Sequence, residues 1–383
     1  MKIPAFKLEE FWRKYEFTSP YLLCCSDAET WSLEELLSLA DSDSLKLWKS
    51  LAFGYTEAPG HPLLRKEIAN LYDSLNSEQI FTFAGAEEGI YCTMRVLVEP
   101  GDHVITIDPC YQSLTSLPEA FGATITKVQL KPENHWKLDL EEVRKAFRSN
   151  TKLLILNYPH NPTGTLLEKK VLEGLISLAR KHGTYIFCDE VYRYLEIDET
   201  LRMPSIADAY EKGIALNVMT KSFGFAGLRI GWLATQDDAF LHEAGSYKLY
   251  TSICNSAPSE ILAIMALRAK EKVLQRNRDI LLKNLHILEA FIKRNQEYVS
   301  WIRPQSGTMA ILKLLLPVSV EDFTQDLVRS EGVLIMPGSV FDLPGNFFRI
   351  GFGKKNMPEI LQRFETYLQA QGHHYAASRK PSH

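Results

Sequence analysis

The stretch LLILNYPHNPTGTLLEKKVLEGLISLARKHGTYIFCD, residues 153–189, decides the fold class of this chain. It opens with an apolar, strand-like run at 153–157 and closes with another at 184–188. Between them, residues 168–182 carry apolar side chains at helical spacing, and Gly183 follows the basic end of that helix as a stop signal. A strand, a helix and a second strand in this order predict a βαβ unit of a parallel sheet.

The same alternation of short apolar runs and helical patterns continues on both sides of this stretch. Several of the runs are apolar throughout, as strands covered on both faces are. The sequence therefore predicts an α/β domain whose mostly parallel seven-stranded sheet is flanked by helices. The further strands are expected at residues 80–83, 103–107, 124–129, 215–219 and 231–234.

The C-terminal part of the chain follows another pattern and predicts a second, smaller α+β domain. Residues 258–295 show one unusually long helical pattern, which we expect to connect the two domains. Mixed strands are expected after it, at 309–315, 333–336 and 347–351. A chain of 383 residues exceeds what one hydrophobic core usually organises, which agrees with two unequal domains.

These patterns divide the chain into four parts. The N-terminal segment, 1–45, has an amphipathic stretch at 31–40 but no sheet of its own, and we expect it to pack with the small domain. The large domain is expected at 46–285 and the small domain at 286–371. The polar end, 372–383, has nothing to bury and is expected to form a flexible tail.

Composition and charge restrict the classes of partner. Apolar residues make up 45% and charged residues 23% of the chain, as in ordinary globular proteins, and the formal net charge is −4. Because no sustained basic run occurs, nucleic acids and acidic membranes are not expected as partners. The sequence offers neither an apolar signal-peptide core nor a membrane-spanning stretch, so we expect a soluble, unexported protein.

The six cysteines are scattered, without CxxC spacing or neighbouring histidines. This arrangement argues against a metal site and against a disulfide framework, and a reducing cytoplasm fits it best. The sequence also lacks the motifs of two other enzyme classes. A nicotinamide dehydrogenase would need GxGxxG after an early strand, and a serine hydrolase would need a GxSxG elbow.

The segment NVMTKSFGFAGLRIGW, residues 217–232, places Lys221 directly after a buried strand. A lysine in that position is poorly hydrated and loses its proton more readily, which makes it a candidate Schiff-base nucleophile. The glycines that follow allow a tight turn, which would bring Arg229 back toward the same pocket. Taken alone, the segment is equally compatible with a surface lysine and a structural arginine.

Other chemistry-bearing residues follow other predicted strands, at the edge where α/β sheets bind ligands. In FAGAEEGIY, Gly85, Ala86 and Glu87 begin a helix whose backbone N–H groups could approach a phosphate. In DPCYQS, Tyr111 offers a flat face for stacking on an aromatic ring, although a tyrosine at such a place is usually a packing residue.

Two further strand ends carry an amide and a carboxylate. The octet NYPHNPTG, residues 157–164, forms a proline-containing turn that would hold the Asn161 amide toward a ring oxygen. In IFCDEVYRY, Asp189 ends an apolar strand and Tyr192 follows three residues later. A buried carboxylate needs a cationic partner, which a protonated ring nitrogen would provide and which an ordinary salt bridge to arginine would provide as well.

In order and spacing, these motifs resemble the class I and II aminotransferases of fold type I, which use pyridoxal 5′-phosphate (PLP). The resemblance extends from Ala52 to Gly353. It implies that Lys221 forms the Schiff base with PLP and that Arg229 holds the cofactor phosphate. It also implies that Asn161, Asp189 and Tyr192 contact the cofactor ring, with Asp189 keeping the ring nitrogen protonated.

The resemblance implies further partners of cofactor and substrate. Tyr55, in GYTEAPGHPLLR, matches the tyrosine that this family sends across a dimer interface to the partner subunit's phosphate, so a homodimer is implied. Arg349, in FFRIGFG, matches the arginine that binds the substrate α-carboxylate, for which a planar guanidinium is suited, with Asn161 beside it. One departure is Val218, which stands where many relatives have a hydroxyl residue and leaves Thr220 as the phosphate hydroxyl.

The activity implied is transfer of an amino group between an L-amino acid and a 2-oxo acid, both small molecules. No second arginine for a substrate side chain is assignable. An alternative remains, because FWRKYEFTSPYLLCCSDAE, residues 11–29, and DPCYQSL, residues 108–114, resemble the branch that contains capreomycidine synthase. That branch implies a PLP-dependent lyase or cyclase built on the same site residues.

Overall fold

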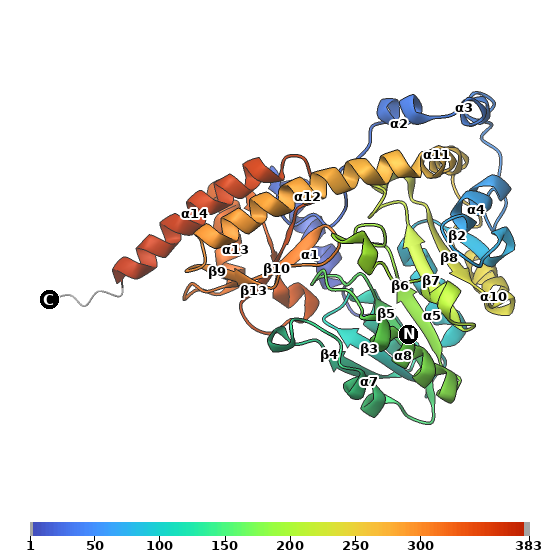
Figure 1. Ribbon diagram of the computed structural model, residues 1–383, viewed down its shortest axis with the longest axis horizontal. Helices are drawn as coiled ribbons and strands as arrows, with labels where there is room; N and C mark the ends of the chain where they lie inside the picture. The colour runs from blue at the N-terminus through green and yellow to red at the C-terminus, as the bar shows by residue number, and fades with distance from the viewer. Residues whose placement is uncertain (1–2, 379–383) are drawn as a thin grey trace.

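The computed structural model describes residues 3–378, and Figure 1 shows a large and a small domain joined by a long helix. Within these residues, the large sheet has seven strands in the order β2-β8-β7-β6-β5-β3-β4. Strand β8 is antiparallel to both neighbours and the other pairs are parallel, so the predicted fold class is confirmed. The strands are β2 (Ile80–Phe83), β3 (His103–Asp108), β4 (Thr124–Gln129), β5 (Thr151–Asn157), β6 (Tyr185–Asp189), β7 (Gly213–Val218) and β8 (Gly231–Thr235).

Two layers of helices cover the two faces of this sheet. Because side chains alternate along a strand, Leu154 and Leu156 of β5 pack with one layer, whereas Leu153 and Ile155 pack with the other. The first layer includes α7 (Leu140–Ala146) and α8 (Lys169–His182), and the second includes α5 (Ala86–Leu97), α6 (Ser113–Ala120) and α10 (Asp238–Lys248). The remaining helices of this domain are α4 (Pro62–Ala69), α9 (Ile206–Ala209) and α11 (Ala257–Arg268).

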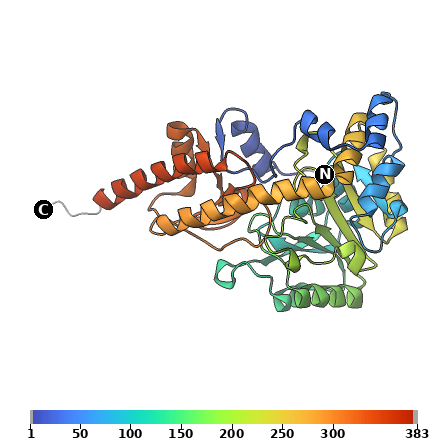
Figure 2. The ribbon, with the colours of Figure 1, turned by 45° about the horizontal axis from the view of Figure 1, so that its top comes forward.

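The small domain is built on an antiparallel sheet in the order β12-β13-β10-β9. Its strands are β9 (Val299–Trp301), β10 (Met309–Leu314), β12 (Met336–Pro337) and β13 (Phe347–Gly351). Helices α12 (Lys270–Arg294), α13 (Val320–Glu331) and α14 (Met357–Ser378) bury apolar side chains in one core with this sheet. Figure 2 shows α12 reaching from the large domain along the small one.

The helical pattern at 258–295 is divided into two helices, which corrects the expectation of one. The backbone leaves helical geometry at Ala269, where ψ is 16°. Helix α11 before the break is buried on almost every side, whereas α12 after it has one buried face. The two helices therefore pack in different surroundings, and the break lets the chain change direction between them.

The N-terminal segment divides between the two domains, although it was expected to pack with the small one. Helix α1 (Lys7–Tyr15) contacts a short 3₁₀ turn of the small domain, η5 (Gly338–Phe341). Strand β1 (Tyr21–Leu22) forms a two-stranded parallel sheet with β11 (Val333–Leu334), so this segment does contribute a strand and the run 333–336 is shared between two sheets. Helices α2 (Leu33–Leu39) and α3 (Ser42–Lys49) contact α11 instead.

The polar end of the chain also differs from expectation. Helix α14 continues to Ser378, so the beginning of the expected tail is helical, while residues 379–383 lie outside the described residues. Over residues 3–378, no helix combines the length and apolarity that crossing a membrane requires.

Candidate active site

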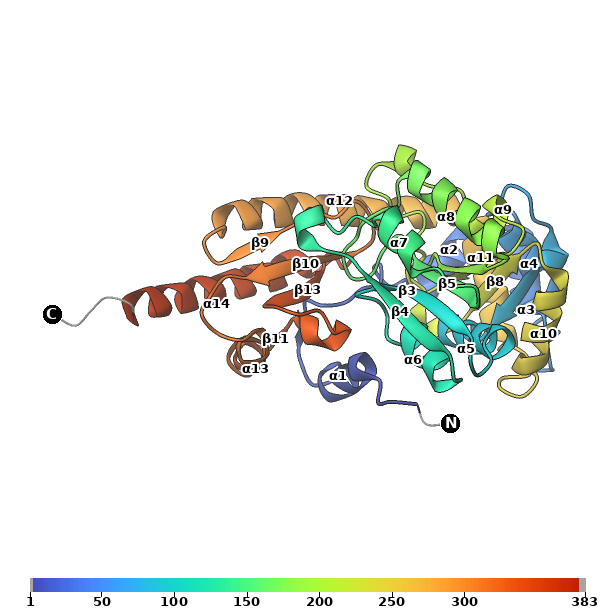
Figure 3. The same cartoon turned by 90° about the horizontal axis from the view of Figure 1, so that it is seen from below.

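A cavity of about 370 Å³ lies at the carboxyl edge of the large sheet, facing the small domain and the N-terminal segment. The strand ends bring residues far apart in sequence to this one place. Most of the residues predicted from the sequence line it, namely Ala86, Glu87, Tyr111, Asn161, Asp189, Tyr192, Thr220, Lys221, Arg229 and Arg349. Figure 3 shows α1 at the junction of the two domains. Leu8, Glu9 and Trp12 of this helix line the cavity.

Lys221 lies three residues after β7, with its amine directed into the cavity. Its Nζ donates a hydrogen bond to Ser26 Oγ over 3.1 Å and lies 6.0 Å from the centre of the Tyr192 ring. The adjacent Ser222 hydroxyl donates to the carbonyl of Val191 over 2.9 Å. The turn that carries the lysine is therefore fixed to the loop that carries Tyr192.

Asp189 ends β6 with a buried carboxyl group. Burial raises its pKa to about 7, while the Val191 N–H, which donates to Oδ1 over 3.2 Å, and the nearby Lys221 act in the opposite direction. A carboxyl group held in this way favours a cationic partner in the cavity.

Arg349 reaches the cavity from β13 of the small domain and is only 1% exposed. Its Nη1 donates to Asn161 Oδ1 over 3.1 Å and its Nη2 donates to the Cys24 carbonyl over 3.0 Å. Its Nε has no hydrogen-bond partner among the described residues, and neither does Tyr192 Oη. Both atoms are buried donors without a partner, and both belong to residues that line the cavity.

Arg229 lines the cavity beside the N-terminus of α5, whereas Gly85 itself is not among the lining residues. Gly85 caps the N-terminus of α5 with a φ of +94°, and a Cβ atom at this position would lie 2.3 Å from Arg229 Nη2. The missing side chain lets the guanidinium lie over the first turn of the helix. Free N–H groups at a helix N-terminus and a guanidinium together favour an anion such as phosphate.

Comparison with known proteins gives the same assignment as this geometry. Residues 37–364 match the family described as aminotransferase class I and II. The chain belongs to this family. The recognition made from the sequence motifs is thereby confirmed.

Relatives of this aminotransferase-family chain differ in their names. It is 27% identical to an aspartate aminotransferase of Pyrococcus horikoshii over 83% of each chain. It is 24% identical to capreomycidine synthase of Streptomyces vinaceus over 99% of this chain and 96% of that one. Among solved structures, a PLP-dependent aminotransferase from Streptococcus suis is 34% identical, with a TM-score of 0.92 over the whole of both chains.

Two predicted residues of this family member lie differently from the rest. Tyr55 is 91% exposed and does not line the cavity within its own chain. Glu87 begins α5 as expected, but its carboxylate accepts a hydrogen bond from Ser113 Oγ over 3.2 Å, and burial raises its pKa to about 7. Its side chain thus lies toward Tyr111, whose hydroxyl donates to Glu9 over 3.3 Å.

The N-terminal segment provides a part of the site that the sequence motifs do not predict. Ser26 contacts the lysine amine, and Cys25 and Asp27 line the cavity beside it. Glu16 of the same segment also lines the cavity. No strand-end motif marks these residues, because tertiary packing alone brings them to the sheet edge.

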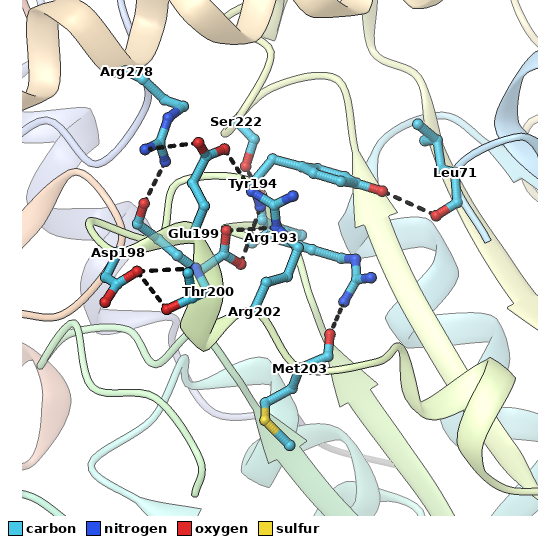
Figure 4. A network of polar contacts seen from close by, with 12 residues as sticks. Leu71, Arg193, Tyr194, Asp198, Glu199, Thr200, Arg202, Met203, Ser222 and Arg278 are labelled. Atoms are coloured by element: carbon cyan, nitrogen blue, oxygen red, sulfur yellow. Dashed lines mark hydrogen bonds and ion pairs between the residues drawn. The ribbon is translucent and has the colours of Figure 1, made fainter. Parts of the chain in front are cut away.

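A polar network behind the cavity supports the loop after β6 (Figure 4). Arg202 binds Glu199 over 3.2 Å, and Arg278 of α12 lies 3.4 Å from the same carboxylate. Tyr194, whose φ is +79°, donates from its hydroxyl to the Leu71 carbonyl over 3.0 Å. The loop carrying Tyr192 is therefore attached to the interdomain helix as well as to the large domain.

Proposed function

We propose that the protein is a PLP-dependent aminotransferase that moves an amino group between an L-amino acid and a 2-oxo acid. The observation that carries the proposal is the convergence of Lys221, Asp189 and Arg229 on one cavity. A nucleophilic amine, a buried carboxyl group and an anion-binding end are the three partners that the aldehyde, ring nitrogen and phosphate of PLP require.

The residues present fit this cofactor. The buried Asp189 carboxyl group would pair with the protonated ring nitrogen, which supplies the cation that its surroundings favour. Arg229, Thr220 and the N-terminus of α5 at Gly85 and Ala86 would hold the phosphate. Tyr111 would stack on the ring, and Asn161 and Tyr192, whose hydroxyl has no partner in the described chain, would donate to the ring oxygen.

The chain's own groups then divide the work of the reaction. When bound, PLP supplies the electron sink that lets the α-proton of an amino acid be removed. Arg349 binds the α-carboxylate of the amino acid, with Asn161 beside it. Lys221, once its amine is free, takes the α-proton, and its contact with Ser26 holds Nζ on the substrate side of the cavity.

We infer that two copies of the chain assemble. Large exposed apolar side chains gather on two segments that are attached to each other, because Thr56 Oγ1 donates to the Asn255 carbonyl over 3.1 Å. A second copy would bury this patch and receive Tyr55 at its phosphate end. The exposed side chains are Phe53, Tyr55, Leu249, Tyr250 and Ile253.

A reducing cytoplasm is the compartment we propose. All six cysteines are free, and four of them are buried. Thiols in such surroundings persist where the glutathione pool keeps them reduced.

A second candidate function is a PLP-dependent lyase or cyclase. The observation that supports it is the match to capreomycidine synthase over 99% of this chain, while the Streptococcus suis aminotransferase matches the whole chain as well. Both candidates use the same lysine, carboxyl group and arginines, so the cavity alone does not separate them.

The test is product analysis on PLP-loaded protein. The protein is incubated with single L-amino acids and with a second 2-oxo acid, and both products are identified by chromatography and mass spectrometry. An aminotransferase gives a new 2-oxo acid and a new amino acid in equal amounts. Ammonia release or a cyclic product without amino transfer would instead support the lyase or cyclase and overturn the first proposal.

A further inference from the structure

The face of α1 that covers the cavity carries an unusual combination of side chains. Glu9, Trp12 and Glu16 lie on it, one turn apart in sequence, and all three line the cavity. We call this surface the Glu9–Trp12–Glu16 face. An aromatic ring between two carboxylates is the chemistry with which proteins bind an organic cation.

The charges of this helix are segregated. Arg13 and Lys14 line a separate hollow between α1 and α13, where Arg13 pairs with Glu10 through its Nε at 3.1 Å. Lys7, on that same side, forms an ion pair with Asp342. The basic side chains of α1 therefore lie away from the cavity, while the acidic ones at positions 9 and 16 lie toward it.

The position of Glu16 does not help to stabilise helix α1. It occupies the C-cap of α1, where the negative end of the helix dipole disfavours a carboxylate. Burial, Glu9 and Asp27 all raise its pKa. Asp27 is paired with Lys354 over 2.7 Å, whereas Glu16 makes no ion pair or side-chain hydrogen bond with any described residue.

The cations of the cavity are already assigned. In the described chain, the basic side chains that line it are Lys221, Arg229 and Arg349, which serve the aldehyde, the phosphate and the α-carboxylate in the function proposed above. None of these three basic side chains is left to bind an acidic substrate side chain. Arg349 Nε and Tyr192 Oη, which have no partner in the described chain, belong to residues that also line this cavity.

Resting on that proposed function, we propose that the Glu9–Trp12–Glu16 face recognises the positively charged end of a substrate side chain. The amino donor is then an amino acid that carries an ammonium or guanidinium group, such as L-ornithine, L-lysine or L-arginine. The carboxylates pair with the cation and the Trp12 ring packs against it.

The test compares amino acids of different charge on PLP-loaded protein. L-ornithine, L-lysine and L-arginine are the cationic set, L-norleucine is the neutral reference and L-glutamate is the acidic one. We expect kcat/KM for the best cationic amino acid to exceed that for L-norleucine by about tenfold or more, as one charge-assisted contact provides. A higher kcat/KM for L-norleucine or L-glutamate than for every member of the cationic set would overturn the inference.

Variants of the glutamates on α1 test which side chains cause the preference for cationic amino acids. Glu16→Gln should lower kcat/KM for the cationic set about tenfold and leave L-norleucine unchanged, and Glu9→Gln should act in the same direction. Glu10→Gln is the matched control, because Glu10 lies on the other side of the same helix, and it should change neither. Equal losses for cationic and neutral amino acids in Glu16→Gln would contradict recognition of charge.

A binding measurement separates this inference from the proposed function. The α-methyl analogues of L-ornithine and L-norleucine lack the α-proton, so calorimetry measures their Kd without turnover. Tighter binding of the ornithine analogue, lost in Glu16→Gln, supports the inference. Turnover of neutral or acidic amino acids without any cationic preference removes the inference and leaves the aminotransferase. If no amino acid changes the cofactor spectrum, both the inference and the proposed function are contradicted.

Discussion

Arg349 and Asn161 are 188 residues apart in sequence, yet Arg349 Nη1 donates to Asn161 Oδ1 over 3.1 Å in a buried contact. The arginine belongs to the small domain and the asparagine to the turn after β5 of the large domain. In the proposed function, a substrate carboxylate bound by Arg349 would therefore lie beside the residue that would contact the cofactor ring. In the proposed function, this hydrogen bond would link the substrate site to the cofactor site.

Lys221→Ala is expected to abolish covalent attachment of PLP, because the lysine that lines the cavity in the described chain is Lys221. The measurement is borohydride reduction of the PLP-loaded protein followed by peptide mapping. Wild-type protein should carry the phosphopyridoxyl label on the peptide that contains Lys221. A label on any other lysine would show the assignment to be wrong.

Asp189→Asn should keep bound PLP but lose turnover by about a hundredfold or more, since an amide does not stabilise a protonated ring nitrogen. Single-turnover absorbance measurements with an amino acid check this. Rates close to the wild-type value would exclude the role.

The cofactor-free protein provides a control for Asp189 that does not depend on catalysis. The pKa of the Asp189 carboxyl group is raised from 3.8 to about 7, so between these pH values the folded state holds a proton that the unfolded state releases. The free energy of unfolding therefore falls as pH rises through this window. The cost at pH 8 is at most about 4 kcal/mol for this group. Urea denaturation should therefore find cofactor-free Asp189→Asn more stable than wild type at pH 8, with the difference vanishing toward pH 4.

Arg349→Lys should raise the Michaelis constant for amino acids and lower kcat/KM by about ten- to a thousandfold, while PLP affinity stays nearly unchanged. Lysine keeps the charge but loses the planar pair of donors. Arg229→Lys is the comparison, because it should weaken PLP binding itself. Equal loss of PLP from both variants would show that the two arginines do not have the separate roles assigned to them.

Gly85→Ala should weaken PLP binding by about tenfold or more, with the fold retained. Alanine is strained at a φ of +94°, and its Cβ would lie 2.3 Å from Arg229 Nη2, so the guanidinium must leave the helix N-terminus. Gly227→Ala is the matched control, since a Cβ atom there meets nothing within 4 Å. Cofactor titration of both variants gives the comparison, and similar PLP affinities would count against the proposed phosphate site.

The contribution of Tyr55 to the partner subunit's cavity can be tested by mixing subunits of two variants. If Tyr55 serves the partner's cavity, Tyr55→Ala and Lys221→Ala are each defective, but a mixed dimer contains one site with both residues intact. Refolding the two variants together should therefore restore activity that neither has alone. No gain on mixing, with dimers demonstrated by light scattering, would place Tyr55 outside the partner's site.

The sequence predicted the parts of the site that follow from local pattern. Strand ends are visible as apolar runs, and the sheet places Asn161, Asp189 and Lys221 at one edge because parallel strands share a direction. Ser26 and Glu16 were not predictable in this way. They reach the cavity through the pairing of β1 with β11 and the packing of α1, which are contacts between segments about 300 residues apart.

The break at Ala269 and the helical end to Ser378 escaped prediction for a different reason. Apolar spacing is continuous through 258–295, so periodicity alone does not distinguish one helix from two that change surroundings. The polar residues after Gly372 lack an apolar pattern of their own, and they extend a helix whose earlier turns are anchored in the small-domain core.

The parallel pair of Tyr21–Leu22 with Val333–Leu334 also sets an order of events during synthesis. The ribosome makes β1 before the whole large-domain sheet, and it makes the partner strand β11 only after that sheet. The large-domain sheet, whose strands lie between residues 80 and 235, can assemble before then. Helix α1 and Ser26 adjoin β1 in sequence, so the cavity wall that they form is complete only after β11 has been made.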